Sequence, residues 1–501
     1  MKPFNLPSIA FLALFLLMPL SACSDNGKEE DGKETALTLS PESFTFPAEG
    51  GTATLTVSSS LRIRLSSDAD WCTATTGSAQ GTAQTQVYTV TASANAAYQA
   101  RTATLTVSAG SESKQVTVSQ AAAEEPVVPD TPSDQLPPDA TGMESDAATL
   151  VARMTRGWNL GNTLEATGGE TAWGNPLTTA EMIKKVKEAG FNAIRIPCSW
   201  NQYLEADAAP YTIKPTWMSR VKEVVDYCVD NGLYAILNIH WDGGWLETSI
   251  PNGYSETVNE KQRSLWKQIA IAFRDYDEHL LFAGCNEPNV ENAAQMTTLL
   301  RYEQTFVDAV RGTGGRNAYR SLIVQGPSTD IDKTLQLMTT LPTDPATKRL
   351  ILEVHYYTPW TFAGLEKDES WGKMAYFWGE DNQGYAQGAY AGRWDNTGGE
   401  TAMRNQLEKM KTTFIDKGIP VILGEYGALR RTLSDSSNST ENAEAQKGHD
   451  ASRAAYIGYA THQAQAYGMA PFFWDAGNSM SLFKRPEMTV IDPGVYEAMM
   501  K

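Results

Sequence analysis

Residues 280–288 are Leu-Leu-Phe-Ala-Gly-Cys-Asn-Glu-Pro, and residues 421–427 are Val-Ile-Leu-Gly-Glu-Tyr-Gly. Each stretch begins as a short apolar run, which is typical of a strand buried on both faces. Each run is followed by a glutamate, Glu287 in the first stretch and Glu425 in the second. Strands of this kind belong to parallel sheets that are covered by helices. The two stretches therefore predict a parallel sheet that carries two carboxylates at one edge.

Six further runs of this kind lie in residues 143–501, which gives eight candidate strands. They span residues 156–162, 191–197, 233–240, 280–286, 321–326, 349–357, 420–426 and 470–475. Amphipathic helices alternate with them, and the first of these helices begins with a capping box formed by Thr178 and Glu181. Eight βα units in this length predict an α/β fold, the (β/α)8 TIM barrel. A doubly wound sheet is the alternative, but Gly157-Trp158-Asn159-Leu160-Gly161 lacks the spacing of a phosphate-binding loop.

Residues 37–122 have a different pattern, in which threonine alternates with small apolar residues. The hexapeptide Thr-Ala-Thr-Leu-Thr-Val occurs at residues 52–57 and again at residues 102–107. Several short runs of period two, separated by turn residues, predict a small β-sandwich. We expect Trp71 to be the central aromatic of its core and Tyr88 to be buried as well. A proline-rich linker, residues 123–142, then leads to the predicted barrel of residues 143–501.

The N-terminus has the pattern of an export signal. Lys2 supplies a positive charge, residues 9–17 form an apolar run too short to cross a bilayer, and Leu20-Ser21-Ala22-Cys23 resembles a bacterial lipobox. We therefore predict a lipoprotein signal peptide over residues 1–22, lipidation of Cys23 and a flexible acidic tether over residues 23–36. The lipid would anchor the exported chain in the outer membrane, at the cell surface. A plain secretory signal is the alternative.

The composition argues against several classes of function. The chain has 41 Lys and Arg against 59 Asp and Glu, so its formal net charge of −18 repels a nucleic-acid backbone. None of the five histidines has the spacing of a metal-binding motif, and we expect neither a metal nor a cofactor. No Gly-x-Ser-x-Gly motif supports acyl transfer. Five cysteines are too few for a disulfide framework. We also expect the protein to be a monomer.

Polar and aromatic residues gather at the carboxyl ends of six predicted strands, where a TIM barrel places its active site. They are Arg195, His240, Asn286, Glu287, His355, Tyr357, Glu425 and Trp474. A barrel does not need these residue types on one face for its stability. Partial burial raises the pKa of a carboxyl group, and two neighbouring carboxylates titrate apart, so that one can be an acid while the other is a base. Hydrolysis of a glycosidic bond requires such a pair, and Glu287 and Glu425 fit this requirement.

These strand ends resemble glycoside hydrolase family 5, a family of retaining enzymes, across residues 150–480. The resemblance includes the stretch Gly-Trp-Asn-Leu-Gly-Asn-Thr-Leu-Glu at residues 157–165. It implies that Glu287 is the general acid/base and Glu425 the nucleophile. The other implied roles concern residues around this pair: Arg195 and Tyr357 hold Glu425 ionised and oriented, His240 and Asn286 contact the sugar, His355 lines the site, and Trp474 forms its floor.

The sandwich resembles the BACON domain, an immunoglobulin-like module. The resemblance rests on Trp71 and on residues 101–107 and 116–120. The family name suggests sugar binding, but nothing in this stretch forms a sugar platform. We expect a spacer that lifts the barrel away from the membrane, and a glycan-binding sandwich is the alternative.

A long connection after the sixth strand, residues 358–400, points to the substrate. It carries nine aromatic residues, of which we expect about half to pack the loop against the barrel: Trp360, Phe362, Trp371, Tyr376, Phe377, Trp378, Tyr385, Tyr390 and Trp394. The others, with Trp173, Trp200, Trp241 and Trp245 on neighbouring loops, would line an open cleft for a polysaccharide.

The motif set is most similar to endo-β-1,4-glucanases, which cleave internal bonds of cellulose or mixed-linkage glucan. A xyloglucan-specific endo-β-1,4-glucanase is the alternative, because the sequence does not show the width of the cleft. A cell-surface glycan-binding protein without activity is the alternative of another class, and the presence of both glutamates argues against it.

Overall fold

The computed structural model describes residues 36–76, 85–97, 99–123, 134–395 and 397–501. The chain divides into two units, with the division after Glu125. Cys23 and the predicted signal peptide lie outside the described residues. Among the helices that the structure describes, none has the length and apolar character that crossing a membrane requires.

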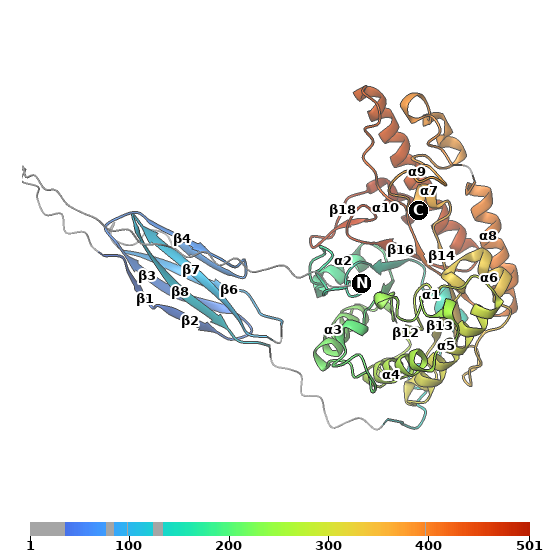
Figure 1. The fold of residues 1–501 in the computed structure, drawn as a ribbon, viewed down its shortest axis with the longest axis horizontal. Coiled ribbons are helices and arrows are strands. Elements are labelled where there is room, and N and C mark those ends of the chain that lie inside the picture. Colours follow the sequence, from blue (N-terminus) through green and yellow to red (C-terminus); the bar gives the residue numbers. More distant parts are fainter. Residues whose placement is uncertain (1–35, 77–84, 98, 124–133, 396) are drawn as a thin grey trace, which may run out of the picture. The chain divides into compact units, whose positions relative to one another are not determined.

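The N-terminal unit is a sandwich of two four-stranded sheets, as predicted (Figure 1). The strands of the first sheet, in spatial order, are β1 (Thr38–Ser40), β3 (Gly51–Ser58), β6 (Thr85–Ala92) and β5 (Cys72–Thr76). Those of the second sheet are β2 (Ser43–Phe46), β8 (Glu112–Gln120), β7 (Arg101–Ala109) and β4 (Ile63–Ser67). The two copies of the hexapeptide lie in β3 and β7, where leucine and valine point into the core.

Trp71 does not occupy the centre of this core, so that prediction is wrong. Its ring is half-buried just before β5, with the guanidinium of Arg101 lying 4.4 Å from its centroid. The next residue, Cys72, is fully buried and takes the inward position. Because successive strand residues face opposite sides of a sheet, Trp71 and Cys72 cannot both point inward. Tyr88 is buried, as predicted.

The C-terminal unit is a closed barrel of eight parallel strands, and all eight predicted strands are present. In barrel order they are β9 (Gly157–Leu160), β10 (Ala193–Ile196), β11 (Tyr234–Asn238), β12 (Leu280–Ala283), β13 (Leu322–Gln325), β14 (Leu350–Tyr356), β15 (Val421–Tyr426) and β16 (Ala470–Asp475). Every strand pairs in parallel with its neighbours, and β16 pairs with β9 to close the ring. The carboxyl ends of all eight strands therefore open on the same face.

Helices surround this barrel (Figure 1). They are α2 (Ala180–Glu188), α3 (Pro215–Asp230), α4 (Glu256–Ala272), α5 (Ala293–Arg311), α6 (Ile331–Leu337), α7 (Trp360–Ala363), α8 (Glu400–Thr413), α9 (Ser439–Ala466) and α10 (Pro493–Met500). A short hairpin of β17 (Phe483–Lys484) and β18 (Thr489–Val490) follows β16. The N-cap of α2 is Thr179, whose hydroxyl accepts from the N–H of Met182, so the capping residue is one position later than the predicted Thr178.

The barrel has two apolar layers. Side chains between the strands and the surrounding helices form the larger core, which includes the stripe of Met182, Ile183 and Val186 on α2. A second cluster fills the barrel interior, and α1 (Ala147–Arg153) contributes Leu150 and Val151 to it. The polar groups of the strand ends consequently sit on a rigid, fully packed base.

Candidate active site

The two predicted glutamates lie together at the carboxyl end of the barrel. Glu425 is the fifth residue of β15 and is almost fully buried, whereas Glu287 follows β12 and exposes 44% of its side chain. One carboxylate oxygen of each, together with a ring nitrogen of His355, lies within 4.8 Å of the others. Retaining glycosidases hold their two carboxyl groups about 5–5.5 Å apart, whereas inverting enzymes need roughly 6.5–9.5 Å for a water molecule. The short separation fits direct attack by one carboxylate.

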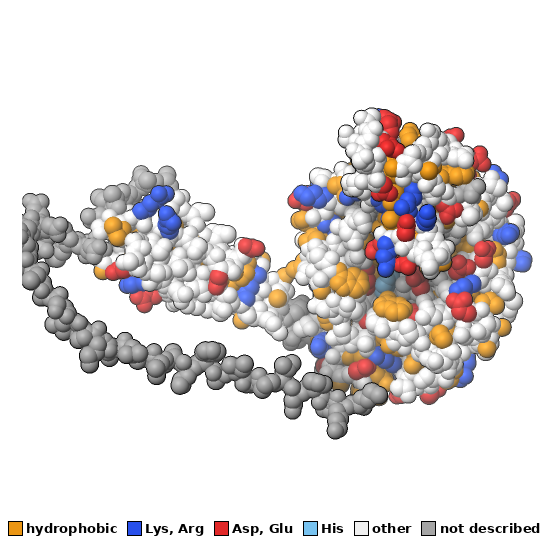
Figure 2. All heavy atoms as spheres, turned by 45° about the horizontal axis from the view of Figure 1, so that its top comes forward, with side chains coloured by type: hydrophobic (Ala, Val, Ile, Leu, Met, Phe, Trp, Pro, Cys, Tyr) orange, Lys and Arg blue, Asp and Glu red, His pale blue; other side chains and the backbone are white. Residues whose placement is uncertain are grey.

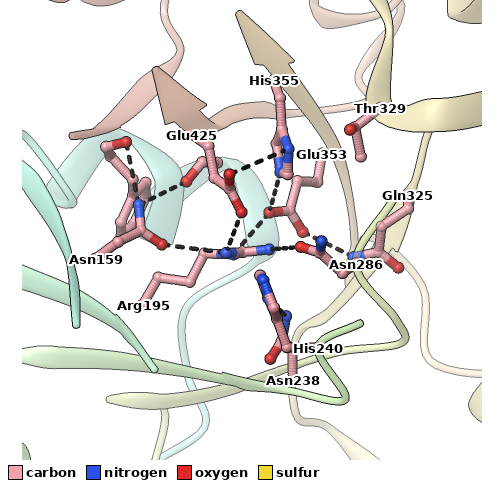
Figure 3. A network of polar contacts seen from close by, with 12 residues as sticks. Asn159, Arg195, Asn238, His240, Asn286, Gln325, Thr329, Glu353, His355 and Glu425 are labelled. Atoms are coloured by element: carbon pink, nitrogen blue, oxygen red, sulfur yellow. Dashed lines mark hydrogen bonds and ion pairs between the residues drawn. The ribbon is translucent and has the colours of Figure 1, made fainter. Parts of the chain in front are cut away.

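Arg195 lies at the centre of a polar network that includes Glu425, Glu353, Asn159 and Asn286 (Figure 3). Its side chain is fully buried on β10, and Nη1 donates to Oε1 of Glu425 at 2.8 Å and to the side-chain oxygen of Asn159 at 3.1 Å. Nη2 donates to the side-chain oxygen of Asn286 at 2.8 Å. The planar guanidinium thus fixes Glu425 and Asn286 in one rigid arrangement.

Glu353 also pairs with Arg195, and the sequence analysis missed it. Its Oε1 lies 2.8 Å from Nε of Arg195, and its Oε2 accepts from the side-chain amide of Gln325 at 2.7 Å. Gly424 leaves the space that this side chain fills, because a Cβ at Gly424 would lie 2.0 Å from Oε1 of Glu353. Glu353 stands two residues before His355 on β14, so the period of a strand already placed both on one face.

Removal of Arg195 would take away the cation that lies nearest to the buried carboxylates of Glu353 and Glu425, 2.8 Å from each. We expect Arg195→Met to lower the free energy of unfolding by about 3–5 kcal/mol at pH 7, which is the typical cost of breaking a buried pair. Chemical denaturation of the two proteins measures this difference. The double variant Arg195→Met/Glu353→Gln should recover part of the loss, because one of the uncompensated charges is removed with the arginine. A double variant no more stable than Arg195→Met would contradict this account of the network.

His355 lies between three carboxylates, which determine its protonation. Nδ1 is 2.7 Å from Oε1 of Glu287 and 3.7 Å from Oε2 of Glu425, and Nε2 is 3.2 Å from Oε1 of Glu353. Burial lowers the pKa of His355, but the charges of Glu425, Glu287 and Glu353 outweigh burial and raise it to about 9. The imidazole is therefore protonated at neutral pH.

The roles expected from the sequence require a higher pKa for Glu287, the acid, than for Glu425, the nucleophile. In the structure the two pKa values are shifted the other way. Burial raises the pKa of Glu425, and Glu287 and Glu353 act in the same direction, so that Arg195 and His355 compensate only in part. Partial burial also raises the pKa of Glu287, but the hydrogen bond and the charge of His355 outweigh it and lower the pKa below its ordinary value. Two features distinguish the pair: Glu425 is almost fully buried, whereas Glu287 exposes 44% of its side chain and is hydrogen-bonded directly to His355.

Tyr357, His240 and Trp474, the other residues predicted for the site, also lie at the carboxyl end of the barrel beside the two glutamates. The hydroxyl of Tyr357 donates to Oε2 of Glu425 at 3.1 Å. His240 stacks on Trp474 with the ring centroids 5.7 Å apart and the planes at 12°. Burial, and the positive charges of Arg195 and His355, lower the pKa of His240 well below its usual range, so this ring is neutral. All eight residues predicted from the strand ends thus converge on one site.

The aromatic residues of the surrounding loops range from buried to exposed, and Trp200, which was predicted to line the cleft, is fully buried instead. Of the nine on the connection after β14, five are buried, as the sequence analysis expected for about half of them: Phe362, Tyr376, Phe377, Trp378 and Tyr390. Four tryptophans on the loops around the barrel mouth are exposed: Trp173, Trp241, Trp360 and Trp371. Figure 2 shows hydrophobic side chains beside the hollow in which a histidine is visible. A cavity of about 220 Å³, lined by Glu287, His355, Tyr357 and Trp360 among others, adjoins the pair of glutamates.

A parallel eight-stranded barrel that carries two glutamates this close at its strand ends is the site of a retaining glycosidase. Comparison with known proteins agrees. Residues 159–480 match the family described as "Cellulase (glycosyl hydrolase family 5)", and residues 62–121 match BACON, described as "Putative binding domain, N-terminal". The chain belongs to glycosyl hydrolase family 5 and is an enzyme of its endo-β-1,4-glucanase class.

Three similar proteins of the family illustrate how closely this chain matches its relatives in sequence and structure. The xyloglucan-specific endo-beta-1,4-glucanase BoGH5A of Bacteroides ovatus is 35% identical over 97% of this chain and 94% of its own length. The structure of XEG5B, a xyloglucan-specific beta-1,4-glucanase from a ruminal metagenomic library in complex with XXLG, covers 71% of this chain and 95% of that one, with 38% identity and a TM-score of 0.62. A broad-specificity endoglucanase from Ruminococcus champanellensis with bound cellotriose covers 71% and 99%, with 33% identity and a TM-score of 0.58.

Proposed function

We propose that this protein is a xyloglucan-specific endo-β-1,4-glucanase that acts by double displacement. The observation that carries this proposal is the similarity to BoGH5A, because it spans 97% of the chain and so includes the sandwich as well as the barrel. XEG5B, which matches the barrel, is also described as xyloglucan-specific. These relatives favour xyloglucan over the linear β-glucans that the sequence analysis placed first. The exposed tryptophans around the barrel mouth suit a broad polysaccharide chain.

In the first step of the proposed mechanism, Glu425 attacks the anomeric carbon while a proton passes to the leaving glycosidic oxygen from Glu287. The covalent glycosyl-enzyme that forms is then hydrolysed by a water molecule, whose proton returns to Glu287. Arg195 and Tyr357 orient the attacking carboxylate through their hydrogen bonds. Trp474 would stack on the sugar at the cleavage point, and Asn286 and His240 would contact it.

The proton for the first step belongs to Glu287 and His355 together. In the free protein it resides on Nδ1 of His355, which donates to Glu287 across 2.7 Å. When Glu287 acts as acid, the proton moves along this hydrogen bond to the carboxylate, and the imidazole keeps the proton on Nε2, next to Glu353. Activity therefore requires two protons on Glu287 and His355 together. One is shared between the Glu287 carboxylate and Nδ1 of His355, and the other stays on Nε2 of His355.

This arrangement predicts the alkaline limb of the pH profile. A pKa raised to about 9 means that the shared proton is held below pH 9 and lost as the pH rises through that value. We expect kcat/KM to fall with a midpoint near pH 9 in the wild-type protein, and at least about one pH unit lower in His355→Asn, where Glu287 must hold the proton alone. Initial rates from pH 4 to pH 11 measure both midpoints. An unchanged alkaline midpoint in His355→Asn would exclude proton sharing.

The substrate is tested by incubating the purified protein with xyloglucan, mixed-linkage β-glucan, carboxymethyl cellulose, xylan and mannan. Reducing ends and the sizes of the first products are measured. We expect the fastest release from xyloglucan, with branched oligosaccharides as products and a rapid fall in polymer size, as internal cleavage requires. Faster release from an unbranched β-glucan would overturn the specificity. No release from any polymer would favour a glycan-binding protein instead.

We also propose that the protein is a lipoprotein of the outer membrane at the cell surface. The proposal rests on the lipobox pattern that ends at Cys23. In cells fed a labelled fatty acid, the wild-type protein should carry the label and Cys23→Ser should not. Label on both variants, or on neither, would contradict the assignment. Exposure at the surface is tested by adding protease to intact cells.

A further inference from the structure

The connection between β11 and α4 contains a backbone feature that the proposed mechanism does not use. Three consecutive residues have left-handed backbone angles: Asp242 has a φ of 53°, Gly243 of 78° and Gly244 of 74°. Glycine adopts such angles at little cost, but an aspartate does so only where its surroundings fix it. This turn follows Trp241, which directly follows His240 of the active site.

The side chain of Asp242 fixes the turn. It is almost fully buried and accepts from the hydroxyl of Ser199 at 2.5 Å, from the N–H groups of Trp200 and Asn201 at 2.9 Å, and from the indole N–H of Trp245 at 3.0 Å. All four partners are donors, so each of them stabilises the ionised carboxylate. Asp242 therefore ties its own turn to the loop that follows β10.

Gly244 supports the indole of Trp241. A Cβ at Gly244 would lie 2.6 Å from Cζ2 of Trp241, so the ring rests where only a glycine leaves room. Trp241 is nevertheless 42% exposed. Trp245, in the same loop, is different: its N–H is bound by Asp242 and the Nζ of Lys261 lies 5.0 Å from its ring centroid. Trp245 therefore belongs to the support of the loop, and Trp241 is the aromatic side chain that it presents.

We propose that Asp242 and Gly244 are positioning residues that hold the indole of Trp241 as a preformed stacking platform for a sugar unit of the polysaccharide. The proposal rests on the function proposed above and adds a specificity determinant to it. An indole face matches the apolar C–H face of a pyranose, and a ring that is already fixed loses little conformational entropy when the sugar binds. The platform contributes to binding of the chain and not to the bond-breaking step.

The predicted signature is a rise in KM with little change in kcat. We expect Trp241→Ala to raise KM about 5- to 10-fold. Gly244→Ala should have a similar effect, because its methyl group displaces the indole. Gly243→Ala is the matched control, since Gly243 has the same kind of backbone angle but no atom within 4 Å of the position of a Cβ. It carries the same strain without touching Trp241, and its KM should stay near the wild-type value.

The double variant Trp241→Ala/Gly244→Ala separates positioning from general damage. If Gly244 acts through Trp241, the double variant has the KM of Trp241→Ala alone. A double variant whose rise in KM equals the product of the two single rises would overturn the proposal. An unchanged KM in Trp241→Ala would overturn it too, and this variant decides the question even if Gly244→Ala fails to fold. The assays use whichever polymer the wild-type protein cleaves fastest. An error about xyloglucan would therefore appear in the wild-type rates, whereas an error about the platform would appear only in the variants.

Discussion

Glu425→Gln is expected to lower kcat on the polysaccharide by roughly 10⁴-fold or more and to leave substrate binding intact. The carboxamide has almost the shape of the carboxylate, and its one oxygen can still accept from Arg195, while its NH2 group can donate to the hydroxyl of Tyr357. It carries no negative charge and cannot form the glycosyl ester, so the first displacement is lost. Steady-state rates and calorimetric titration with an oligosaccharide product measure the two properties separately.

Glu303→Gln is the control for this variant. Glu303 is another buried carboxyl group, on the outside of the barrel, and it accepts from the N–H of Gln325 at 2.9 Å. A glutamine can keep that hydrogen bond, so the rate should stay within a few-fold of wild type. If Glu425→Gln were as active as this control, the assignment of Glu425 as nucleophile would be wrong.

The identity of the nucleophile has a second, chemical test. Glu425→Ala leaves a small space below the anomeric carbon, and azide can attack from there in place of the carboxylate. Since only one displacement then occurs, the product is a glycosyl azide of inverted configuration. Proton NMR identifies the anomer. A product with retained configuration would place the nucleophile elsewhere.

The strands and the site were predictable to the extent that they depend on local patterns. A strand buried on both faces must be apolar, so runs such as residues 421–424 can be recognised in the sequence. The barrel topology then places the carboxyl ends of these strands together. Glu353 was missed because it stands inside such a run, where Arg195, Gln325 and His355 stabilise its charge. Arg195 and Gln325 lie on other strands, and no local pattern records those two pairings.

Two further differences concern Trp71 and the pair of glutamates. In β5 the residues Cys72 and Ala74 face the core and the threonines between and after them are exposed, so the period of two places Trp71 on the outer side. The division of pKa values between Glu287 and Glu425 depends on how deeply each carboxylate is buried and on the direct hydrogen bond between His355 and Glu287. Residue types identified the participants, whereas the geometry decides which of them holds the proton.

Glu287→Ala is expected to lower kcat/KM on the polysaccharide by about 10²–10⁴-fold, the usual contribution of a general acid. The effect should depend on the leaving group, which distinguishes it from the loss of Glu425. A sugar alkoxide cannot leave without a proton, whereas a nitrophenolate can, so an activated aryl glycoside should form the glycosyl-enzyme at a rate much closer to wild type. Rapid-mixing measurements should therefore show a burst of nitrophenol followed by slow turnover, because the second step still lacks its base.

His355 should not replace the missing acid in this variant. Its Nδ1 reaches Glu287 at 2.7 Å, so the carboxylate carries the proton from the imidazole to the bond that breaks. Glu291→Gln is a suitable control, because Glu291 is an exposed residue of the same loop, paired with Lys333 at 2.6 Å, and its loss should leave the rates unchanged. If activity on the polysaccharide and on the activated aryl glycoside fell by the same factor in Glu287→Ala, with no burst, the role of Glu287 would not depend on the leaving group, and Glu287 could not be the acid. A burst that azide converts into rapid turnover, with a glycosyl azide of retained configuration, is the outcome that double displacement requires, because azide then attacks the covalent intermediate from the face that water would use.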